Sequence, residues 1–517
     1  MHIGILTDYP VVTFTNGPSL ATQALKCYLE NRGHTVTIIG PRPGPGEPAA
    51  QPGSVLLDAI DFRAHPGVRI PFAWPPAAFS NAPKFDVIHS HANSLLMHWA
   101  PMMRELHGIP CLATNTIYLP SFAQHLLPNQ IYSFELVRNF WSSLSFTVER
   151  SFAKVYNQGD GLIVQCPQLE NYWRKMGELR VPLHCIPRPI DERVFDATLG
   201  TDPFRKNFKR GFRCITVGRH AREKDLDKVI LAFAKYILPK CPDASLTLVG
   251  DGMEHQPLIT QVRSLGVDHR VDFVGERPHR ELRDYYGHAD LFLYASMSET
   301  YGQVISEALW CGVPVVAADD KMGVASQVES GADGILVADG KDLVRKIGDA
   351  AADLLQDAQK RRAFGQDAAR RARERVAPVK VHAAYEAAYE SAIEHARANP
   401  PVRRNIVNPL DWLQLLNDHL VPWTWKHVAM CAIGSFRGAK GYDVAKDLRW
   451  DDIDAPIPAT ATATAAAVAA AASAARAPST NKTTNAEAAV APDAAVKPAA
   501  KKRKAPAKKA DSAAPAK

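Results

Sequence analysis

The sequence predicts an α/β protein with two Rossmann-like, doubly wound domains, a helical C-terminal appendage and a disordered tail. Short apolar runs of strand length alternate with stretches of helical periodicity through about the first 400 residues. Such alternation with short connections is typical of parallel strands joined by covering helices. The length of 517 residues allows two or three domains, and a hydrophobic content of 46% is enough to fill their cores.

A proline- and charge-bearing stretch, residues 188–202, separates the two predicted domains. The expected parts are residues 1–190 for the first domain, 205–378 for the second, about 380–397 for a further helix, 400–454 for a Trp-rich helical appendage and 455–517 for the tail. The tail is rich in Ala, Pro, Thr and Lys and has no aromatic residue. Such a segment cannot bury enough apolar surface to offset the entropy of ordering it.

The first domain opens as a strand–loop–helix–strand unit, expected at residues 2–7, 19–32 and 36–39. The unit lacks the G-x-G-x-x-G fingerprint, so the sequence does not support a dinucleotide cofactor. Further strands are expected at residues 85–89, 110–114 and 161–165, the last of them closing this half.

His89 and His91 stand two residues apart at the end of an expected strand and therefore share a face. A pair of histidines on one face could contribute to a metal site. A complete site needs further ligands, and the sequence identifies none, so we do not favour a metal site here.

The second domain contains the stretch LFLYASMSETYGQVISEALWCGVPVVAADD, residues 291–320, which predicts a strand, a helix and a second strand. Glu299 lies in the loop after the first strand, at the carboxyl end where open α/β sheets bind ligands. Glu307 lies inside the helix, eight residues further on. The elements expected in this domain are strands at 214–217, 245–249, 271–274, 291–295 and 313–317 and helices at 229–236 and 303–310.

Two carboxylates also suggest a glycosidase, but their separation argues against one. Eight residues of helix rise about 12 Å. A retaining glycosidase needs its carboxylates roughly 5–5.5 Å apart and an inverting one about 6.5–9.5 Å. Glu299 and Glu307 are better placed to hold two separate parts of one extended ligand.

The stretch from Glu299 to Glu307, followed by Gly312-Val313-Pro314, strongly resembles the glutamate–seven residues–glutamate signature of retaining nucleotide-sugar glycosyltransferases of family 4, also called glycosyl transferases group 1. The resemblance implies the GT-B arrangement, in which two Rossmann-like domains face a cleft. It also implies that Glu299 contacts the donor sugar and Glu307 the ribose. The backbone of Gly302, Gln303 and Val304 would face the donor phosphate and sugar, at a helix N-terminus that suits an anion.

A second motif, Gly218-Arg219-His220-Ala221-Arg222-Glu223-Lys224, resembles the diphosphate site of the same family. Arg219 can place a planar fork on phosphate oxygens and Lys224 can add a point charge. Both would stabilise the charge that gathers on the leaving diphosphate. Arg219, Lys224 and Glu299 are therefore the predicted catalytic residues, with Gly218 beside them in the donor site.

The resemblance implies less specific roles for four further residues. Gly17 stands in the loop after the first strand, which faces donor phosphates in the family, and Arg277 in the loop that packs the nucleotide base. On the acceptor side, His91 ends a D-V-I-H-x-H segment near the acceptor cleft. Asn115 stands where many relatives carry a histidine beside the reacting sugar. The helix at about 380–397 is expected to return to the first domain.

The resemblance therefore implies an enzyme, a retaining and metal-independent glycosyltransferase. It would move a hexose from a nucleoside diphosphate sugar to an acceptor hydroxyl, with a UDP-sugar favoured and GDP-mannose as the other donor. No cofactor is implied, because the nucleotide-sugar is a substrate. Two alternatives remain: a nucleotide-sugar epimerase on the same fold, and a non-catalytic membrane or nucleic-acid scaffold, which would not need Arg219 and Lys224.

Charge and cysteine usage bear on partners and compartment. The tail holds ten Lys/Arg and three Asp/Glu, so it accounts for the whole net charge of +7 and the rest of the chain is formally neutral. Nucleic acid is therefore not a favoured partner. Eight cysteines without a C-x-x-C pair suggest a reducing compartment, and no run of 18 strongly apolar residues predicts a transmembrane helix. We expect a cytoplasmic protein that can associate with the inner face of the membrane.

The Trp-rich segment 408–434 supports two interpretations. It contains Trp412, Trp423 and Trp425, and the loop 72–79 adds Trp74. The segment is either a helical appendage packed on the first domain or an interfacial membrane contact, because Trp favours the headgroup region. The second interpretation, together with the basic tail, favours peripheral membrane binding and a lipid acceptor such as diacylglycerol, with a soluble acceptor as the alternative.

Overall fold

The computed structural model describes residues 1–10, 17–44, 48–61, 69–71, 84–92, 95–118, 134, 136–137, 140, 149, 152–176, 179–208, 211–408 and 410–419. The chain divides into two compact units, Met1–Asp454 and Ala455–Lys517. The tail, Trp74, Trp423 and Trp425 lie outside the described residues.

The first sheet has seven strands in the order β3-β2-β1-β6-β7-β8-β9, and every neighbouring pair runs parallel. Its strands are β1 (His2–Leu6), β2 (Thr35–Pro41), β3 (Val55–Leu57), β6 (Val87–Ser90), β7 (Cys111–Thr114), β8 (Gly161–Val164) and β9 (Leu183–Cys185). Its helices are α1 (Gly17–Asn31), α3 (Trp99–His107) and α7 (Pro167–Met176), and a separate antiparallel pair joins β4 (Ala59–Asp61) to β5 (Arg69–Pro71). The prediction that residues 161–165 close this half is wrong, because β9 follows and pairs with β8.

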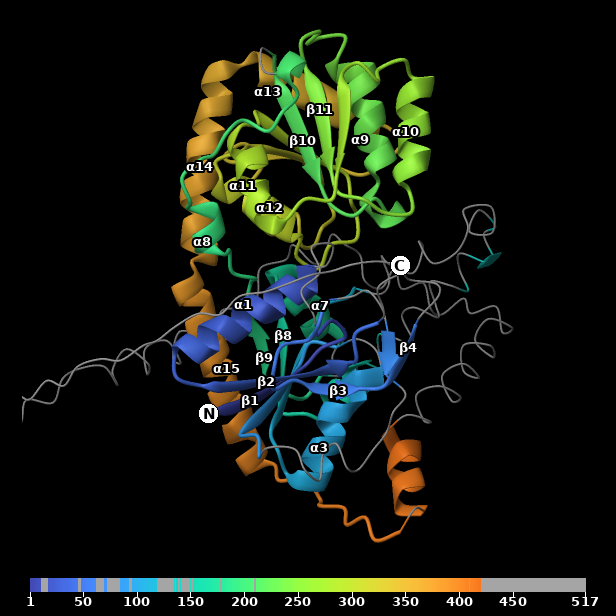
Figure 1. Cartoon of the computed structure of the whole chain (residues 1–517), viewed down its shortest axis with the longest axis vertical. Coiled ribbons are helices and arrows are strands. Elements are labelled where there is room, and N and C mark those ends of the chain that lie inside the picture. The colour runs from blue at the N-terminus through green and yellow to red at the C-terminus, as the bar shows by residue number, and fades with distance from the viewer. Residues whose placement is uncertain are drawn as a thin grey trace, which may run out of the picture. The chain divides into compact units, whose positions relative to one another are not determined.

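The second sheet has six strands in the order β12-β11-β10-β13-β14-β15, again all parallel. Its strands are β10 (Arg213–Val217), β11 (Ser245–Val249), β12 (Val271–Gly275), β13 (Leu291–Tyr294), β14 (Val315–Ala318) and β15 (Gly334–Val337). Its helices are α8 (Glu192–Phe195), α9 (Leu226–Ala232), α10 (His255–Ser264), α11 (His279–Gly287), α12 (Gln303–Trp310), α13 (Leu343–Gln356) and α14 (Ala358–Val376). Two parallel sheets with covering helices confirm the predicted fold class (Figure 1).

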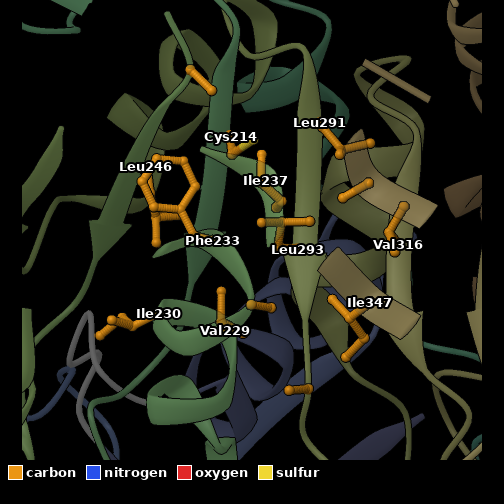
Figure 2. Packing of buried hydrophobic residues seen from close by; sticks show 14 of the residues in the cluster. Cys214, Val229, Ile230, Phe233, Ile237, Leu246, Leu291, Leu293, Val316 and Ile347 are labelled. Carbon is orange, nitrogen blue, oxygen red and sulfur yellow. The ribbon is translucent and has the colours of Figure 1, made fainter. Parts of the chain in front are cut away.

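Strand β13 shows why an uninterrupted apolar run becomes a strand here. Leu291 and Leu293 belong to the buried cluster on one face of the sheet, which also contains Val229 of α9 and Ile347 of α13 (Figure 2). Phe292 and Tyr294 belong to the cluster on the opposite face. Side chains alternate along a strand, so a strand buried on both faces must be apolar throughout.

The last long helix, α15 (Pro378–Ala398), packs on the first sheet rather than the second. Its Tyr385, Tyr389 and Ala392 are buried in the same cluster as Ile3 and Ile5 of β1. The preceding helix, α14, belongs to the second domain, because its inward residues join the cluster around β13 and β14. The chain therefore passes between the domains twice, once before β10 and once between α14 and α15.

The start of the Trp-rich segment forms a helix over residues 410–419 that packs on the first domain. Leu415 is fully buried beside β6 and α3, with Trp412 and Ile406 packed against the same cluster. Two links add to this contact, Arg404 Nε to Glu105 Oε1 at 2.7 Å and His419 to Glu105 Oε2 at 2.7 Å. These contacts, all within the described residues, favour the interpretation that the segment is a helical appendage packed on the first domain. No helix in the described part of the chain is long and apolar enough to cross a membrane.

Candidate active site

The carboxyl edge of the second sheet brings Lys224 and Glu299 together from loops 75 residues apart. Strands β10 and β13 are parallel neighbours, so the loops that follow them meet at one edge. Lys224 Nζ donates to Glu299 Oε1 and forms an ion pair with it. Tyr294 Oη and Ser296 Oγ donate to the same carboxylate oxygen at 2.7 and 2.9 Å.

This arrangement fixes the charge state of Glu299. Burial alone would raise the pKa of its carboxyl, but the charge of Lys224 and the hydrogen bonds from Lys224, Tyr294 and Ser296 outweigh burial and hold the pKa below its ordinary value. Glu299 is therefore ionised at neutral pH. It can accept hydrogen bonds from sugar hydroxyls, but it is not poised to act as a general acid.

Arg219 lies in the same loop as Lys224 and forms an ion pair with Glu223. The backbone carbonyl of Glu223 accepts hydrogen bonds from Ser296 Oγ at 2.8 Å and Ser298 Oγ at 3.3 Å. These contacts fasten the predicted diphosphate loop to the loop that carries Glu299. Lys224 thus contacts the predicted sugar-binding carboxylate directly, whereas Arg219 pairs with Glu223, whose backbone is held by the loop that carries Glu299.

Glu307 lies on α12 and is held by two side chains of α11 that sequence reasoning missed. His279 Nε2 lies 3.0 Å from Glu307 Oε1, and Tyr286 Oη donates to Oε2 at 3.0 Å. Glu307 is only 3% exposed, and each oxygen keeps lone pairs for a further donor. The seven-residue spacing of His279 and Tyr286 puts them on one helix face, but no local pattern in the sequence linked that face to Glu307.

The charge of Glu307 acts back on His279. Burial alone would lower the pKa of the His279 imidazole, but its hydrogen bond and charge interaction with Glu307, together with the charge of Asp191, raise the pKa overall. The protonated ring and the carboxylate therefore stabilise each other.

The loop between the two glutamates has the backbone that a phosphate contact needs. Gly302 caps α12 with a φ of 78°, a left-handed conformation that glycine adopts without strain. Gln303 and Val304 open the helix, where the first N–H groups have no intrahelical partner. The Gln303 side chain donates to the carbonyl of Pro189 at 3.2 Å, so the interdomain linker contacts this helix.

Three other predicted donor residues occupy simpler positions. Gly218 follows β10 directly, and the neighbouring loop approaches it so closely that a Cβ on Gly250 would lie 2.0 Å from the Gly218 carbonyl oxygen. Arg277 follows β12, where its charge acts on Tyr285 and Asp272. Gly17 is the first residue of α1, and the loop before it, residues 11–16, lies outside the described residues.

On the acceptor side, His91 is buried, with its Nδ1 2.8 Å from Thr22 Oγ1. Burial, and to a smaller degree the charge of Arg188, lowers the pKa of His91 to about 3, so the ring is neutral. His89 uses both nitrogens in hydrogen bonds, to Tyr389 Oη at 3.0 Å and Thr114 Oγ1 at 2.7 Å. The alternative of a metal site on His89 and His91 therefore gains no support.

Asn115 is fully buried and donates to Tyr156 Oη at 3.1 Å, so its side chain is part of the first domain's interior. The next residue reaches the other domain, because Thr300 Oγ1 donates to the carbonyl of Thr116 at 3.1 Å. Arg188, which sequence reasoning placed only in the linker, is buried, and its charge interacts with Glu299 and Tyr385. The structure thus brings a third cation near the predicted catalytic pair.

Two protein-family models match this chain in succession. The model described as Glycosyltransferase Family 4 matches residues 15–194, and the model described as Glycosyl transferases group 1 matches residues 201–371. Together they cover most of both Rossmann-like domains and every predicted residue of the candidate site. The chain belongs to the group 1, family 4 glycosyltransferases, which confirms the family resemblance seen in the sequence.

Curated relatives in this family have different substrates. A GDP-mannose-dependent alpha-mannosyltransferase of Mycobacterium tuberculosis is 26% identical over 357 residues, covering 67% of this chain and 86% of that protein. An alpha-monoglucosyldiacylglycerol synthase of Streptococcus pneumoniae is 25% identical over 343 residues, covering 61% of this chain and 71% of that protein.

Solved structures agree on the fold. A sucrose-phosphate synthase from Thermosynechococcus elongatus superposes with a TM-score of 0.60 at 20% identity, covering 76% of this chain and 99% of that one. HepE of Anabaena, solved in complex with UDP, superposes with a TM-score of 0.54 at 19% identity, covering 76% of this chain and 100% of that one. The two-sheet architecture is the GT-B fold.

Proposed function

We propose that this GT-B glycosyltransferase moves a hexose from a nucleoside diphosphate sugar to an acceptor hydroxyl with retention at the anomeric carbon. The observation that carries the proposal is the ion-paired Lys224 and Glu299 at the carboxyl edge of the second sheet, with Arg219 in the same loop as Lys224 and paired with Glu223. We infer that Lys224 and Arg219 bind the diphosphate and that Glu299 binds the sugar joined to it.

In the proposed reaction, the bond from the anomeric carbon to the β-phosphate oxygen breaks while a bond to the acceptor oxygen forms on the same face. The acceptor hydroxyl gives its proton to the departing phosphate. Lys224 has three N–H donors, so it can donate to Glu299 and to a phosphate oxygen at the same time. Arg219 can donate two parallel hydrogen bonds to the diphosphate. Preorganised donors of this kind are commonly the largest contribution to catalysis. The mechanism uses no covalent nucleophile and requires no metal at the reacting centre.

The alternative of an epimerase differs in one observable product. An epimerase converts the donor sugar without an acceptor, whereas a transferase forms a glycoside only when an acceptor is present. Incubating the protein with the donor alone and analysing the sugar separates the two, and conversion of the donor to its epimer would overturn the transferase proposal.

For the donor we favour a UDP-sugar and keep GDP-mannose as the second candidate. The UDP complex of HepE supports the first and the mannosyltransferase of M. tuberculosis the second. Thermal unfolding with UDP, GDP and their sugars tests the choice, because a ligand at 100 times its Kd stabilises the folded state by about 2.7 kcal/mol. The Lys224→Ala protein should lose most of the shift. No shift with any of these nucleotides would overturn the donor assignment.

For the acceptor we propose a membrane lipid with a free hydroxyl, such as a diacylglycerol. The diacylglycerol relative in S. pneumoniae supports this choice. Four aliphatic side chains of the appendage lie exposed to solvent within 12 residues: Val402, Val407, Leu410 and Leu413. The neighbouring Arg403 is also exposed, which suits an anionic surface. Trp412 contributes less than the sequence suggested, because it packs against the first domain.

Co-sedimentation with anionic and neutral liposomes tests the membrane contact, using the full chain and a chain ending at Asp454. The second protein separates the appendage from the basic tail. If neither protein pellets with anionic liposomes at low salt, the lipid acceptor is wrong and a soluble acceptor replaces it.

A further inference from the structure

Three potential metal ligands converge beside the candidate diphosphate loop, on residues to which the proposed reaction assigns no role. They are His220, which follows Arg219, Asp251 in the loop after β11, and His255 at the start of α10. Their ligating atoms all lie within 4.8 Å of one another, and in the described part of the chain they are the one such group of three.

The geometry of the two rings suits a shared ion. His220 Nδ1 and His255 Nδ1 face each other at 2.8 Å, with the rings nearly parallel at an interplanar angle of 14°. His255 Nδ1 lies 3.4 Å from Asp251 Oδ1. Tetrahedral Zn²⁺ with bonds of about 2.0–2.1 Å separates its ligand atoms by roughly 3.3–3.4 Å. The Asp251–His255 distance already fits, and the two rings need to separate by about half an ångström.

The backbone holds the three residues in place without help from the side chains. The His220 N–H donates to the Asp251 carbonyl at 2.8 Å, and the Glu254 N–H donates to the His220 carbonyl at 2.9 Å. Gly252 makes this approach possible, because a Cβ there would lie 2.4 Å from the His220 carbonyl oxygen. The two loops are thus joined before any ion binds, so little conformational entropy is lost on ordering the site when the ion binds.

The surroundings of the three residues favour a bound cation and leave one side of the site open to solvent. Phe273 packs edge-on against both rings and shields them from water. Asp251 is 56% exposed at its side chain, so solvent can supply the remaining ligand. A second carboxylate, Glu276, lies close enough for its charge to interact with Asp251.

We propose that His220, Asp251 and His255 form a binding site for a divalent transition metal, with Zn²⁺ as the best match. Two imidazole nitrogens and one carboxylate are ligands that suit Zn²⁺, whereas Mg²⁺ and Ca²⁺ prefer oxygen ligands alone. The ion replaces the single proton that the two Nδ1 atoms now share. Because His220 is next to Arg219, a bound ion fixes the start of the loop that carries Arg219 and Lys224. The site does not depend on the proposed transferase activity.

The competing interpretation is a hydrogen bond between two neutral histidines that only joins the loops. Untagged protein treated with EDTA and desalted tests this, with Zn²⁺ alone titrated calorimetrically and Mg²⁺ titrated in parallel. The variants are His255→Gln and Asp251→Asn, which remove one ligand each at exposed or half-buried positions. His269→Gln removes an exposed histidine of the same domain outside the group and is the matched control.

We expect one equivalent of Zn²⁺ to bind the wild type and the His269→Gln protein, with Mg²⁺ binding at least about a hundredfold more weakly. Each ligand variant should lose at least about tenfold in Zn²⁺ affinity. Zn²⁺ should raise the Tm of the wild type and of the His269→Gln protein. It should raise the Tm of the His255→Gln and Asp251→Asn proteins less. Equal Zn²⁺ affinity in all four proteins would overturn the site, and so would a wild type that binds no Zn²⁺.

Discussion

The two halves of this protein share a topology but differ in the chemistry at the carboxyl edges of their sheets. In the second domain that edge carries ion pairs, Lys224 with Glu299 and Arg219 with Glu223. In the first domain, His91 after β6 is neutral and hydrogen-bonded to the Thr22 hydroxyl, and Asn115 after β7 donates to the Tyr156 hydroxyl. The same fold thus presents ion pairs at one edge, and at the positions of His91 and Asn115 on the other edge it presents hydrogen bonds between neutral side chains.

Under the proposed reaction, this difference assigns the donor to the second domain and the acceptor to the first. A nucleoside diphosphate carries negative charge that increases as the sugar leaves. Its site therefore needs cations that are already positioned, here by ion pairs with carboxylates, and that can still bind phosphate. An acceptor hydroxyl carries no charge and needs only donors and acceptors of hydrogen bonds. Fold alone does not assign these roles; the side chains at each edge do.

The largest effect on activity is expected from variants that remove a cation from the second domain. Lys224→Ala and Arg219→Ala should each slow sugar transfer by about 10²–10³-fold, the range found when one preorganised oxyanion donor is lost. Steady-state kinetics measures the loss, and circular dichroism checks the fold. Lys240→Ala is the matched control, because Lys240 pairs with Asp349 on an exposed surface. Turnover of Lys224→Ala within about threefold of the wild type would show that the charged edge is not the donor site.

A substitution where the appendage packs on the first domain should lower the stability of the protein rather than the rate of sugar transfer. Leu415→Ala should destabilise the protein by about 2–3 kcal/mol, because Leu415 is fully buried between the appendage and the first domain. Leu413→Ala on the same helix is the control, since Leu413 is 60% exposed and its loss should cost less than about 0.5 kcal/mol. Urea unfolding compares the two. Equal destabilisation would mean that the appendage helix is not held through Leu415.

Within the charged half, the two glutamates should separate in kinetics. Glu307→Ala should raise KM for the donor by about 10–100-fold with a smaller change in kcat, because contacts to ribose are made in both ground and transition states. Glu299→Ala should lower kcat as well, because Glu299 is placed at the reacting sugar and paired with Lys224. The reverse ranking would exchange their roles.

In the second domain the sequence predicted five of the six strands of the sheet but not β15, nor the helices α10, α11, α13 and α14. The best prediction was α12, which begins and ends at the predicted residues 303 and 310. Gly302 and Gly312 explain this accuracy, because both have positive φ and mark the helix limits locally. In the first domain, β9 was missed because its residues Leu183–Cys185 are too few to form a visible apolar run. Strand limits elsewhere differ by one or two residues.

The candidate site was predicted less completely than the fold. Glu299, Glu307, Arg219 and Lys224 were found because each belongs to a short motif. Their partners were not, because His279 lies 28 residues from Glu307 and only the packing of α11 on α12 brings it near. The group of three potential metal ligands was missed for the same reason: the sequence drew attention to His89 and His91, two residues apart, whereas the structure brings His220 next to Asp251 and His255 from a different loop.

The smallest expected effect tests the pairing of His279 with Glu307 through pH. The pKa of His279 is raised in the folded protein, so protonated His279 stabilises the fold. This contribution is fully present below the unfolded pKa of about 6.5 and is lost as pH rises through the folded pKa. The Tm difference between the wild type and His279→Gln should therefore be largest at acid pH and shrink toward alkaline pH. His269→Gln, at an exposed position, should show no such trend. A difference that grows with pH would mean that the ring is held neutral, and the charged pairing that distinguishes the second domain would then not extend to Glu307.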